Sequence, residues 1–388
     1  MNYVKYHMHS DDSLLDSCTD FRLYVDRAVE EGDKAIAFTE HGKPLNWIAK
    51  KMYCDEKGIK YIHGVECYLT ENLSPKVRDN YHTVLLAKNY QGVLEINRII
   101  SRSTDKEHFY FVNRISFDEF LSLSNNVIKI SACLASPLNK LPLQHPRFYE
   151  LVKAYDYLEI QPHNCEDQKD YNICLGALSM QFNKPLIAGT DTHSASKYKA
   201  ECRSILLKAK RKSYGDEDSF DLTYKTYDEL VAAFKEQDVL LEEMYMSAIE
   251  NTVRMADTIE EFSLDKTIKY PILYGSREKD KEKFLETIDK KFKAKLELGI
   301  IPQSQEQGFK DAIDEEVRVF DKLDMCGFML SMSELVSWCK ENGMAIGTSR
   351  GSVGGSRVAY VTDITDLNPE TWHTVFSRFC NADRAEIG

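Results

Sequence analysis

Short apolar runs rich in β-branched residues alternate with helical patterns through about the first 200 residues. The predicted strands cover residues 4–7, 35–39, 60–68, 82–87, 127–131, 157–161 and 185–190. Predicted helices lie between most of them, for example at 21–31, 44–57 and 93–101. Strands and helices that alternate at this rhythm favour a parallel α/β sheet or barrel.

The pattern changes after residue 226, where helical periodicity replaces the β-rich runs. Residues 270–276 are typical of a linker, and Arg277 begins a mixed-charge amphipathic helix. We therefore predict a domain boundary near residue 270, which divides an α/β domain at 1–270 from a second domain at 271–388. The other helices predicted in this half are 227–235, 240–261, 309–323 and 332–341.

Composition excludes several classes of protein. The chain has 388 residues, of which 43% are hydrophobic and 29% charged, so it is not a disordered chain. A net charge of -12 argues against a uniformly basic nucleic-acid coat protein, although it leaves a local basic groove open. The ten cysteines include no C-x-x-C pair, which argues against a disulfide scaffold and a four-cysteine zinc ribbon.

No apolar run approaches the roughly 18–20 residues that span a bilayer. The N-terminus has no apolar segment of the secretory type. We therefore expect a cytoplasmic chain with no membrane partner.

Residues able to bind metal ions occur at or next to the edges of the predicted strands. Any one histidine at such a position is more often an ordinary polar residue, but their combination is a strong signal. Active sites of α/β barrels lie at the carboxyl ends of the strands, and imidazole, carboxylate and thiolate together suit zinc, manganese or iron. The set exceeds the coordination sphere of one ion, so we expect two or three. It comprises His7, His9, His41, Glu66, His82, Cys133, Asp191 and His193.

These stretches resemble the PHP (polymerase and histidinol phosphatase) domain, in the version found at the N-terminus of the bacterial DNA polymerase III alpha subunit. The matching motifs are H-M-H-S at 7–10, S-L-L-D at 13–16, F-T-E-H-G at 38–42, G-V-E-C-Y at 64–68, Y-H-T-V-L-L-A-K at 81–88, I-S-A-C-L at 130–134, L-E-I-Q-P-H at 158–163 and T-D-T-H at 190–193.

The resemblance implies a distorted (β/α)7 barrel and adds Asp16 to the metal ligands. The ligand set then has nine members, within which Asp191, His193 and His41 are the expected catalytic residues. Glu159 and His163 are expected to line the cleft. Glu40 replaces an aspartate that is usual in the family and is expected to act behind the ligands.

A second motif, G-T-S-R-G-S-V-G-G-S, covers residues 347–356. Small residues let a backbone approach a ligand closely, and the N–H groups of such a loop can cradle phosphate. By itself this segment is more often a flexible connector, and it lacks the G-K-[ST] of a Walker A loop. The following residues could form a helix whose N-terminus faces the anion.

This motif resembles the same family's glycine-serine loop, which lies at the start of a palm similar to beta-type nucleotidyltransferases. The resemblance implies that the loop contacts the incoming triphosphate, although Thr348-Ser349 replaces the family's usual Pro-Gly. The implied contacts are Arg350, Gly351, Ser352, Gly355 and Ser356.

Residues 378–384, R-F-C-N-A-D-R, resemble a further stretch of the family, R-F-L-N-P-E-R, and the family's catalytic aspartates follow directly after it. We therefore expect an incomplete palm that does not synthesise DNA alone, from a split gene, an interrupted gene or a shortened chain. In the complete enzyme the resemblance implies Mg²⁺, a DNA primer–template, a deoxynucleoside triphosphate, a downstream palm and fingers segment, and other replisome proteins as partners.

The expected chemistry is metal-dependent phosphoester hydrolysis, in its sharpest form a 3′–5′ exonuclease. One alternative is a free-standing PHP phosphatase that acts on a small phosphomonoester. The other is a catalytically inactive module that binds replisome proteins.

Overall fold

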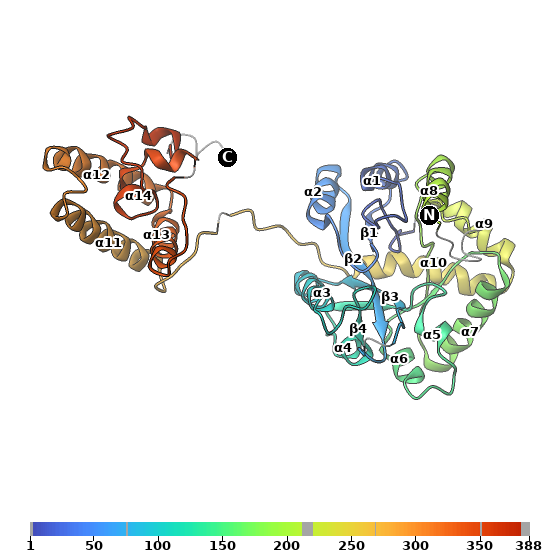
Figure 1. The fold of residues 1–388 in the computed structure, drawn as a ribbon. Coiled ribbons are helices and arrows are strands. Elements are labelled where there is room, and N and C mark those ends of the chain that lie inside the picture. The colour runs from blue at the N-terminus through green and yellow to red at the C-terminus, as the bar shows by residue number, and fades with distance from the viewer. Residues whose placement is uncertain (1–2, 75–76, 212–219, 268, 350, 382–388) are drawn as a thin grey trace. The chain divides into compact units, whose positions relative to one another are not determined.

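The structure, a computed structural model, describes residues 3–74, 77–211, 220–267, 269–349 and 351–381. The chain divides into two compact units, Met1–Ser263 and Leu264–Gly388, which are described separately (Figure 1). Between them, the described residues from 260 to 276 contain no helix or strand.

Unit 1 contains a five-stranded sheet and a two-stranded sheet. In the larger sheet the order is β1 (Ala35–Phe38), β2 (Lys60–Thr70), β3 (Tyr81–Ala87) and β5 (Val127–Ile130), and β4 (Ile115–Ser116) pairs with the end of β2. In the smaller sheet β6 (Leu158–Ile160) pairs with β7 (Leu186–Ala188) in parallel.

Isolated bridges join these sheets into a closed circuit. Ile130 at the end of β5 bridges to Tyr157, just before β6. The N-terminal segment bridges to β1 through Lys5 and to the residue Thr192, beyond β7, through Met8. Of the residues predicted as a strand at 4–7, only Lys5 therefore forms a bridge, and the segment makes no continuous ladder.

The prediction of a purely parallel sheet is wrong at β3. This strand runs antiparallel to both of its neighbours, β2 and β5. No helix separates β2 from β3 among the described residues, so the chain turns back and β3 pairs directly with β2. A parallel return would need a crossover connection, which is usually a helix.

Helices surround the strands of unit 1, and several begin at residues suited to capping. Asp20 accepts a hydrogen bond from the second backbone N–H of α1, and Ser116 and Thr226 form capping boxes with glutamates. The helices are α1 (Phe21–Glu30), α2 (Trp47–Lys57), α3 (Tyr90–Ser103), α4 (Phe117–Leu121), α5 (Pro137–Lys140), α6 (Phe148–Ala154), α7 (Glu166–Phe182), α8 (Lys197–Ala209), α9 (Tyr227–Gln237) and α10 (Glu242–Asp257).

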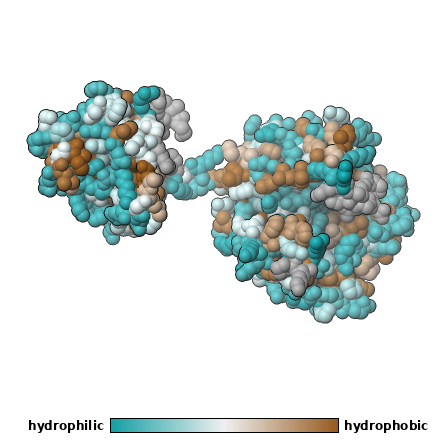
Figure 2. Space-filling model, in the orientation of Figure 1, coloured by the Kyte–Doolittle hydropathy of each residue, from teal (hydrophilic) through white to brown (hydrophobic). Residues whose placement is uncertain are grey.

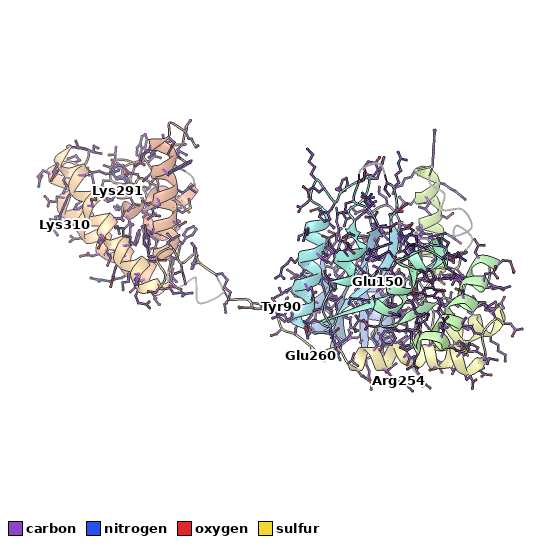
Figure 3. The ribbon with its side chains drawn as sticks, turned by 90° about the horizontal axis from the view of Figure 1, so that it is seen from below. Tyr90, Glu150, Arg254, Glu260, Lys291 and Lys310 are labelled. Carbon is purple, nitrogen blue, oxygen red and sulfur yellow. The ribbon has the colours of Figure 1, made fainter. Side chains whose placement is uncertain are left out.

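Helix α10 ties the two ends of the circuit together. Asn251 donates to the Leu186 carbonyl at 2.7 Å, and Thr252 accepts from the Val4 backbone N–H at 2.9 Å. Its outer face carries exposed residues such as Arg254 (Figure 3). The helix thus covers one side of the strands and leaves the opposite side to the loops that carry the candidate ligands.

Unit 2 is helical, and its described residues contain no strand. Helices α11 (Arg277–Glu297), α12 (Glu306–Lys322), α13 (Cys326–Glu341) and α14 (Arg357–Val361) pack around a separate core that includes Phe284, Phe309 and Phe320. Short 3₁₀ turns cover Gln303–Gln305, Gly351–Gly355 and Phe376–Arg378.

Hydrophilic residues cover most of the visible face of each unit, with scattered apolar side chains between them (Figure 2). Within the described parts of the chain, no helix has the length and apolar character needed to cross a membrane.

Candidate metal centre

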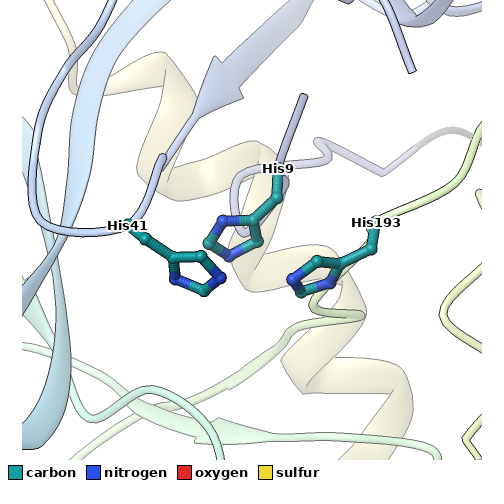
Figure 4. Close-up of side chains that lie close together, drawn as sticks. All are labelled: His9, His41 and His193. Carbon is teal, nitrogen blue, oxygen red and sulfur yellow. The ribbon is translucent and has the colours of Figure 1, made fainter. Parts of the chain in front are cut away.

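Three histidines from distant parts of the chain face one another at one end of the strands of unit 1 (Figure 4). His9 follows the N-terminal segment, His41 follows β1, and His193 follows β7. The ring centroids of His9 lie 4.2 Å from those of His41 and 4.3 Å from those of His193. The strand ends therefore bring imidazoles together across more than 180 residues of sequence, as the position of an α/β active site requires.

Potential ligand atoms form three overlapping groups, in each of which they lie within 4.8 Å of one another. His9 belongs to two of the groups and Glu66 also belongs to two. A residue that belongs to two groups could lie between two neighbouring ions, as a site that binds more than one ion would require. The groups are His9, His41 and His193; His7, His9, Glu66 and Asp191; and Glu66, His82 and Cys133.

Asp16 joins the same cluster through two of its histidines. Its Oδ2 lies 3.0 Å from His41 Nε2 and 3.4 Å from His193 Nε2, and Arg203 of α8 holds its other oxygen at 2.5 Å. All nine side chains predicted as ligands are thus brought together in one connected cluster.

Two buried polar atoms in this cluster have no hydrogen-bond partner among the described residues. They are His9 Nε2 and Asp191 Oδ1, which lie 3.2 Å apart. Burying polar atoms without partners is costly, and a cation between them would remove that cost. The donor set of imidazoles, carboxylates and one thiolate fits zinc, manganese or iron(II).

The carboxylates and histidines also shift one another's pKa values. Burial disfavours the charged form of Glu66, but His82 and His41 hold its pKa well below the usual range. Burial likewise opposes the charge on His41, yet Glu66 and Asp16 raise its pKa to about 10. Without a cation the site therefore holds protons, which metal binding must displace.

The comparisons with known proteins divide the chain in the same way as the motifs. Residues 5–163 match the family model described as "PHP domain", and residues 282–388 match "Bacterial DNA polymerase III alpha NTPase domain". DNA polymerase III subunit alpha of Treponema pallidum is 28% identical over 410 residues, which cover 100% of this chain and 34% of that protein. The corresponding subunit of Aquifex aeolicus is 26% identical, with 100% and 35% covered.

The chain is thus similar to bacterial DNA polymerase III alpha subunits along its whole length. It spans about a third of the length of these curated relatives. Among solved structures, a putative metal-dependent phosphoesterase from Bifidobacterium adolescentis is 13% identical with a TM-score of 0.37, over 49% of this chain and 87% of that one.

Glu159 and His163, expected in the cleft of the PHP domain, are both buried. Glu159 lies behind His7, with its Oε1 2.7 Å from His7 Nδ1, and is fully buried. His163 stacks on Phe220 with centroids 4.5 Å apart. Burial lowers the pKa of His163 to about 4, so its ring is neutral at pH 7.

Sequence reasoning gave no role to Ser13, Lys50 and Arg203, which support the ligands of the PHP domain. Ser13 lies between His9 and Glu40, Lys50 pairs with Glu40 at 2.7 Å, and Arg203 holds Asp16. Ser13 is part of a family motif, so its position was visible. Nothing in the sequence links Arg203 to Asp16, which is 187 residues earlier.

In the polymerase-type unit, the N-terminus of α14 already holds an anion. The buried Glu316 carboxylate accepts from Ser356 Oγ at 2.6 Å, from the Arg357 N–H at 2.9 Å and from the Val358 N–H at 3.0 Å. The expectation that this helix end faces a phosphate is therefore wrong. Ser356 instead bonds to Glu316 and to the Ala359 N–H.

The other predicted triphosphate contacts differ in exposure. Gly355 is buried, and a Cβ at this position would lie 2.4 Å from the Val375 carbonyl oxygen, so the glycine serves close packing. Gly351 and Ser352 are exposed and line a pocket together with Arg378. Arg350 lies outside the described residues.

Proposed function

We propose that the PHP unit is a metal-dependent phosphoesterase that removes nucleotides from DNA 3′ ends, and that the chain is the N-terminal portion of a DnaE-type replicative polymerase. The observation that carries the first part is the pair of unpartnered, buried atoms, His9 Nε2 and Asp191 Oδ1, inside a cluster of nine ligand-type side chains. The second part rests on the two family matches.

The proposed barrel and palm rest on separate observations. The closed circuit of strands and bridges in unit 1 supports a distorted (β/α)7 barrel for the PHP domain, which we assign to residues 1–270. We assign 271–388 to the start of a nucleotidyltransferase-like palm, where Gly351 and Ser352 are the accessible candidates for contact with the triphosphate. In the complete polymerase, DNA and deoxynucleoside triphosphates are the proposed substrates and Mg²⁺ the proposed cofactor.

Two or three divalent ions, when bound to the nine-residue cluster, would supply Lewis acidity and lower the pKa of an attacking water. The chain's own residues would hold these ions and balance their charge. Glu66 and Asp191 supply the buried negative charge, and His7 and His9 are fixed from behind by Glu159 and Ser13. We assign Asp191, His193 and His41 as the metal ligands nearest to the phosphate that reacts. Asp191 and His41 are partly accessible to solvent, and a substrate could therefore approach them.

The test is a labelled DNA primer incubated with the chain and manganese or zinc, followed by length analysis. Asp191→Asn keeps the size of the side chain and removes the charge that holds the cation, so it should abolish release of nucleotides. Asp228→Asn makes the same chemical change at an exposed position of α9 and should leave the rate unchanged.

Equal degradation by the wild type and by Asp191→Asn would contradict this site as the source of the activity. No degradation by wild type at full metal occupancy would favour the inactive module that binds replisome proteins. Hydrolysis of a small phosphomonoester in place of DNA would favour the free-standing phosphatase.

A further inference from the structure

Ser13 connects a buried carboxylate to a buried histidine of the metal centre. Its hydroxyl oxygen lies 2.5 Å from Glu40 Oε2 and 2.9 Å from His9 Nδ1. It also accepts the backbone N–H of His41 at 3.2 Å. The three residues that make these contacts are each at most 1% exposed: Glu40, Ser13 and His9.

Glu40 acts only as an acceptor. Its oxygens receive the Ser10 N–H at 3.0 and 3.1 Å, the Ser10 hydroxyl at 2.5 Å and the Lys50 ammonium at 2.7 Å. An ammonium and two further donors around one carboxyl group favour its ionised form. The remaining donor, the Ser13 hydroxyl, must therefore point its single proton at Glu40.

This direction fixes the proton on His9. Because the Ser13 hydroxyl donates its one proton to Glu40, it can only accept a hydrogen bond from His9. The Nδ1 atom of His9 must therefore carry the proton. In the neutral ring, Nε2 then has a lone pair. Within the described parts of the chain that atom has no hydrogen-bond partner, and it lies 3.2 Å from Asp191 Oδ1 and 3.5 Å from Glu66 Oε2.

We propose that Glu40 and Ser13 are positioning residues that lock His9 in the Nδ1–H tautomer, so that Nε2 is presented as a ligand before any ion binds. The proposal deepens the proposed function, on which it rests for the identity of the ions. Partners behind a ligating histidine generally fix its tautomer and ring orientation, and losing them typically costs about 10- to 100-fold in metal affinity. The Lys50 ammonium favours the ionised form of Glu40, and so the Ser13 hydroxyl continues to donate to Glu40 and to accept from His9.

The chain offers a matched pair of variants. Ser10 and Ser13 each donate a hydroxyl to the same carboxylate at 2.5 Å, and each is buried; among the hydrogen bonds of the described residues, the Ser13 hydroxyl bonds to a histidine ring and the Ser10 hydroxyl does not. Ser13→Ala and Ser10→Ala thus remove equivalent hydrogen bonds to Glu40. Their difference reports on the two contacts that only the first substitution removes, with the His9 ring and with the His41 N–H, and the NMR of His9 separates the first from the second.

The first measurement is nitrogen NMR of the full chain, labelled at histidine and freed of metal with a chelator. The His9 resonances are assigned with His9→Gln. Wild type and Ser10→Ala should show a proton on Nδ1 of His9, and Ser13→Ala should show mixed tautomers. A proton on Nε2 in the wild type, or the same tautomer in both serine variants, would overturn the proposal.

The second measurement is the affinity for Zn²⁺ and Mn²⁺ by competition with a chelator. Ser13→Ala should bind about 10- to 100-fold more weakly than wild type, and Ser10→Ala within about threefold of it. Equal affinities of the two variants would overturn the proposal and leave the phosphoesterase untouched. A wild type that binds neither ion would defeat the proposed function instead, and the NMR measurement, which needs no metal, would still decide on the tautomer.

Discussion

Because Gly189 has no side chain, the carboxylate of Glu159 can occupy the space beside it, behind His7. A Cβ at this position would lie 2.2 Å from Glu159 Oε1, the atom that lies 2.7 Å from His7 Nδ1. Gly189→Ala should therefore push Glu159 away from His7 and lower the affinity for Zn²⁺ by about tenfold. A chelator competition assay measures this. The control is Gly308→Ala, whose added Cβ meets nothing within 4 Å, and equal losses in the two variants would contradict the argument.

His63 makes the stability of unit 1 depend on pH. Burial lowers its pKa to about 4, while Asn97 and Tyr61 bond to its two ring nitrogens at 3.1 and 3.2 Å. Above the unfolded pKa of about 6.5 the ring is neutral in both states. As pH falls from there toward 4, only the unfolded state takes up the proton, so the folded state is progressively destabilised.

The expected loss is about 2 kcal/mol between pH 6.5 and 5, at about 1.4 kcal/mol per pH unit. Urea unfolding of the metal-free chain at both pH values measures it. His63→Gln should remove this part of the pH dependence, whereas His373→Gln, at an exposed position in unit 2, should retain it. An unchanged pH dependence in His63→Gln would refute the assignment.

Single residues of the metal centre could be predicted where a motif fixed their type and spacing. The nine predicted ligands come from seven short segments, and the fold brings them all into one cluster. The residues behind them could not be predicted in the same way. Arg203, for example, reaches Asp16 only because α8 packs beside the N-terminal loop, and no local pattern encodes that approach.

Among the elements, α14 depends on a carboxylate from another helix. Glu316 of α12 accepts three hydrogen bonds at the start of α14, and it is 1% exposed. Glu316→Ala would remove the acceptor of two backbone N–H groups, those of Arg357 and Val358, and of the Ser356 hydroxyl proton. The free energy of unfolding of unit 2 should fall by about 3 kcal/mol.

Chemical denaturation followed by circular dichroism measures this loss. Glu315→Ala removes the neighbouring, exposed carboxylate of the same helix and serves as the control, with an expected change below about 0.5 kcal/mol. Similar effects of the two substitutions would show that Glu316 contributes no more than surface charge.

Several elements could be predicted to within a few residues from periodicity, although the helix predicted at 332–341 lacks the first six residues of α13 and the strand predicted at 4–7 does not form. Residues 21–31 were predicted as a helix and form α1 at Phe21–Glu30, and the mixed-charge helix predicted from Arg277 begins there. Strand direction could not be predicted in this way. Periodicity tells which face of a strand is buried but not which strand lies beside it, so the antiparallel pairing of β3 was missed.

At the scale of the whole molecule, each hydrophobic core cluster formed by the described residues lies within one unit. Three core clusters use residues from Tyr3 to Phe262, and the fourth uses residues from Phe284 to Cys380. A boundary near residue 270 could be expected from the change of composition, because strand-type residues end well before it. The part of the chain that metal ions stabilise is harder to predict from composition, because the ligands come together only in the folded unit.

Metal binding should stabilise unit 1 and leave unit 2 unchanged, since all the candidate ligands lie between His7 and His193. A ligand that binds only the folded state at 100 times its dissociation constant stabilises it by about 2.7 kcal/mol. Calorimetry of the full chain should therefore show two transitions, of which Zn²⁺ raises one and a chelator lowers the same one. Asp191→Asn should abolish this shift, and Glu316→Ala should move only the other transition. A shift of both transitions with metal, or of neither, would contradict a metal centre that is confined to unit 1.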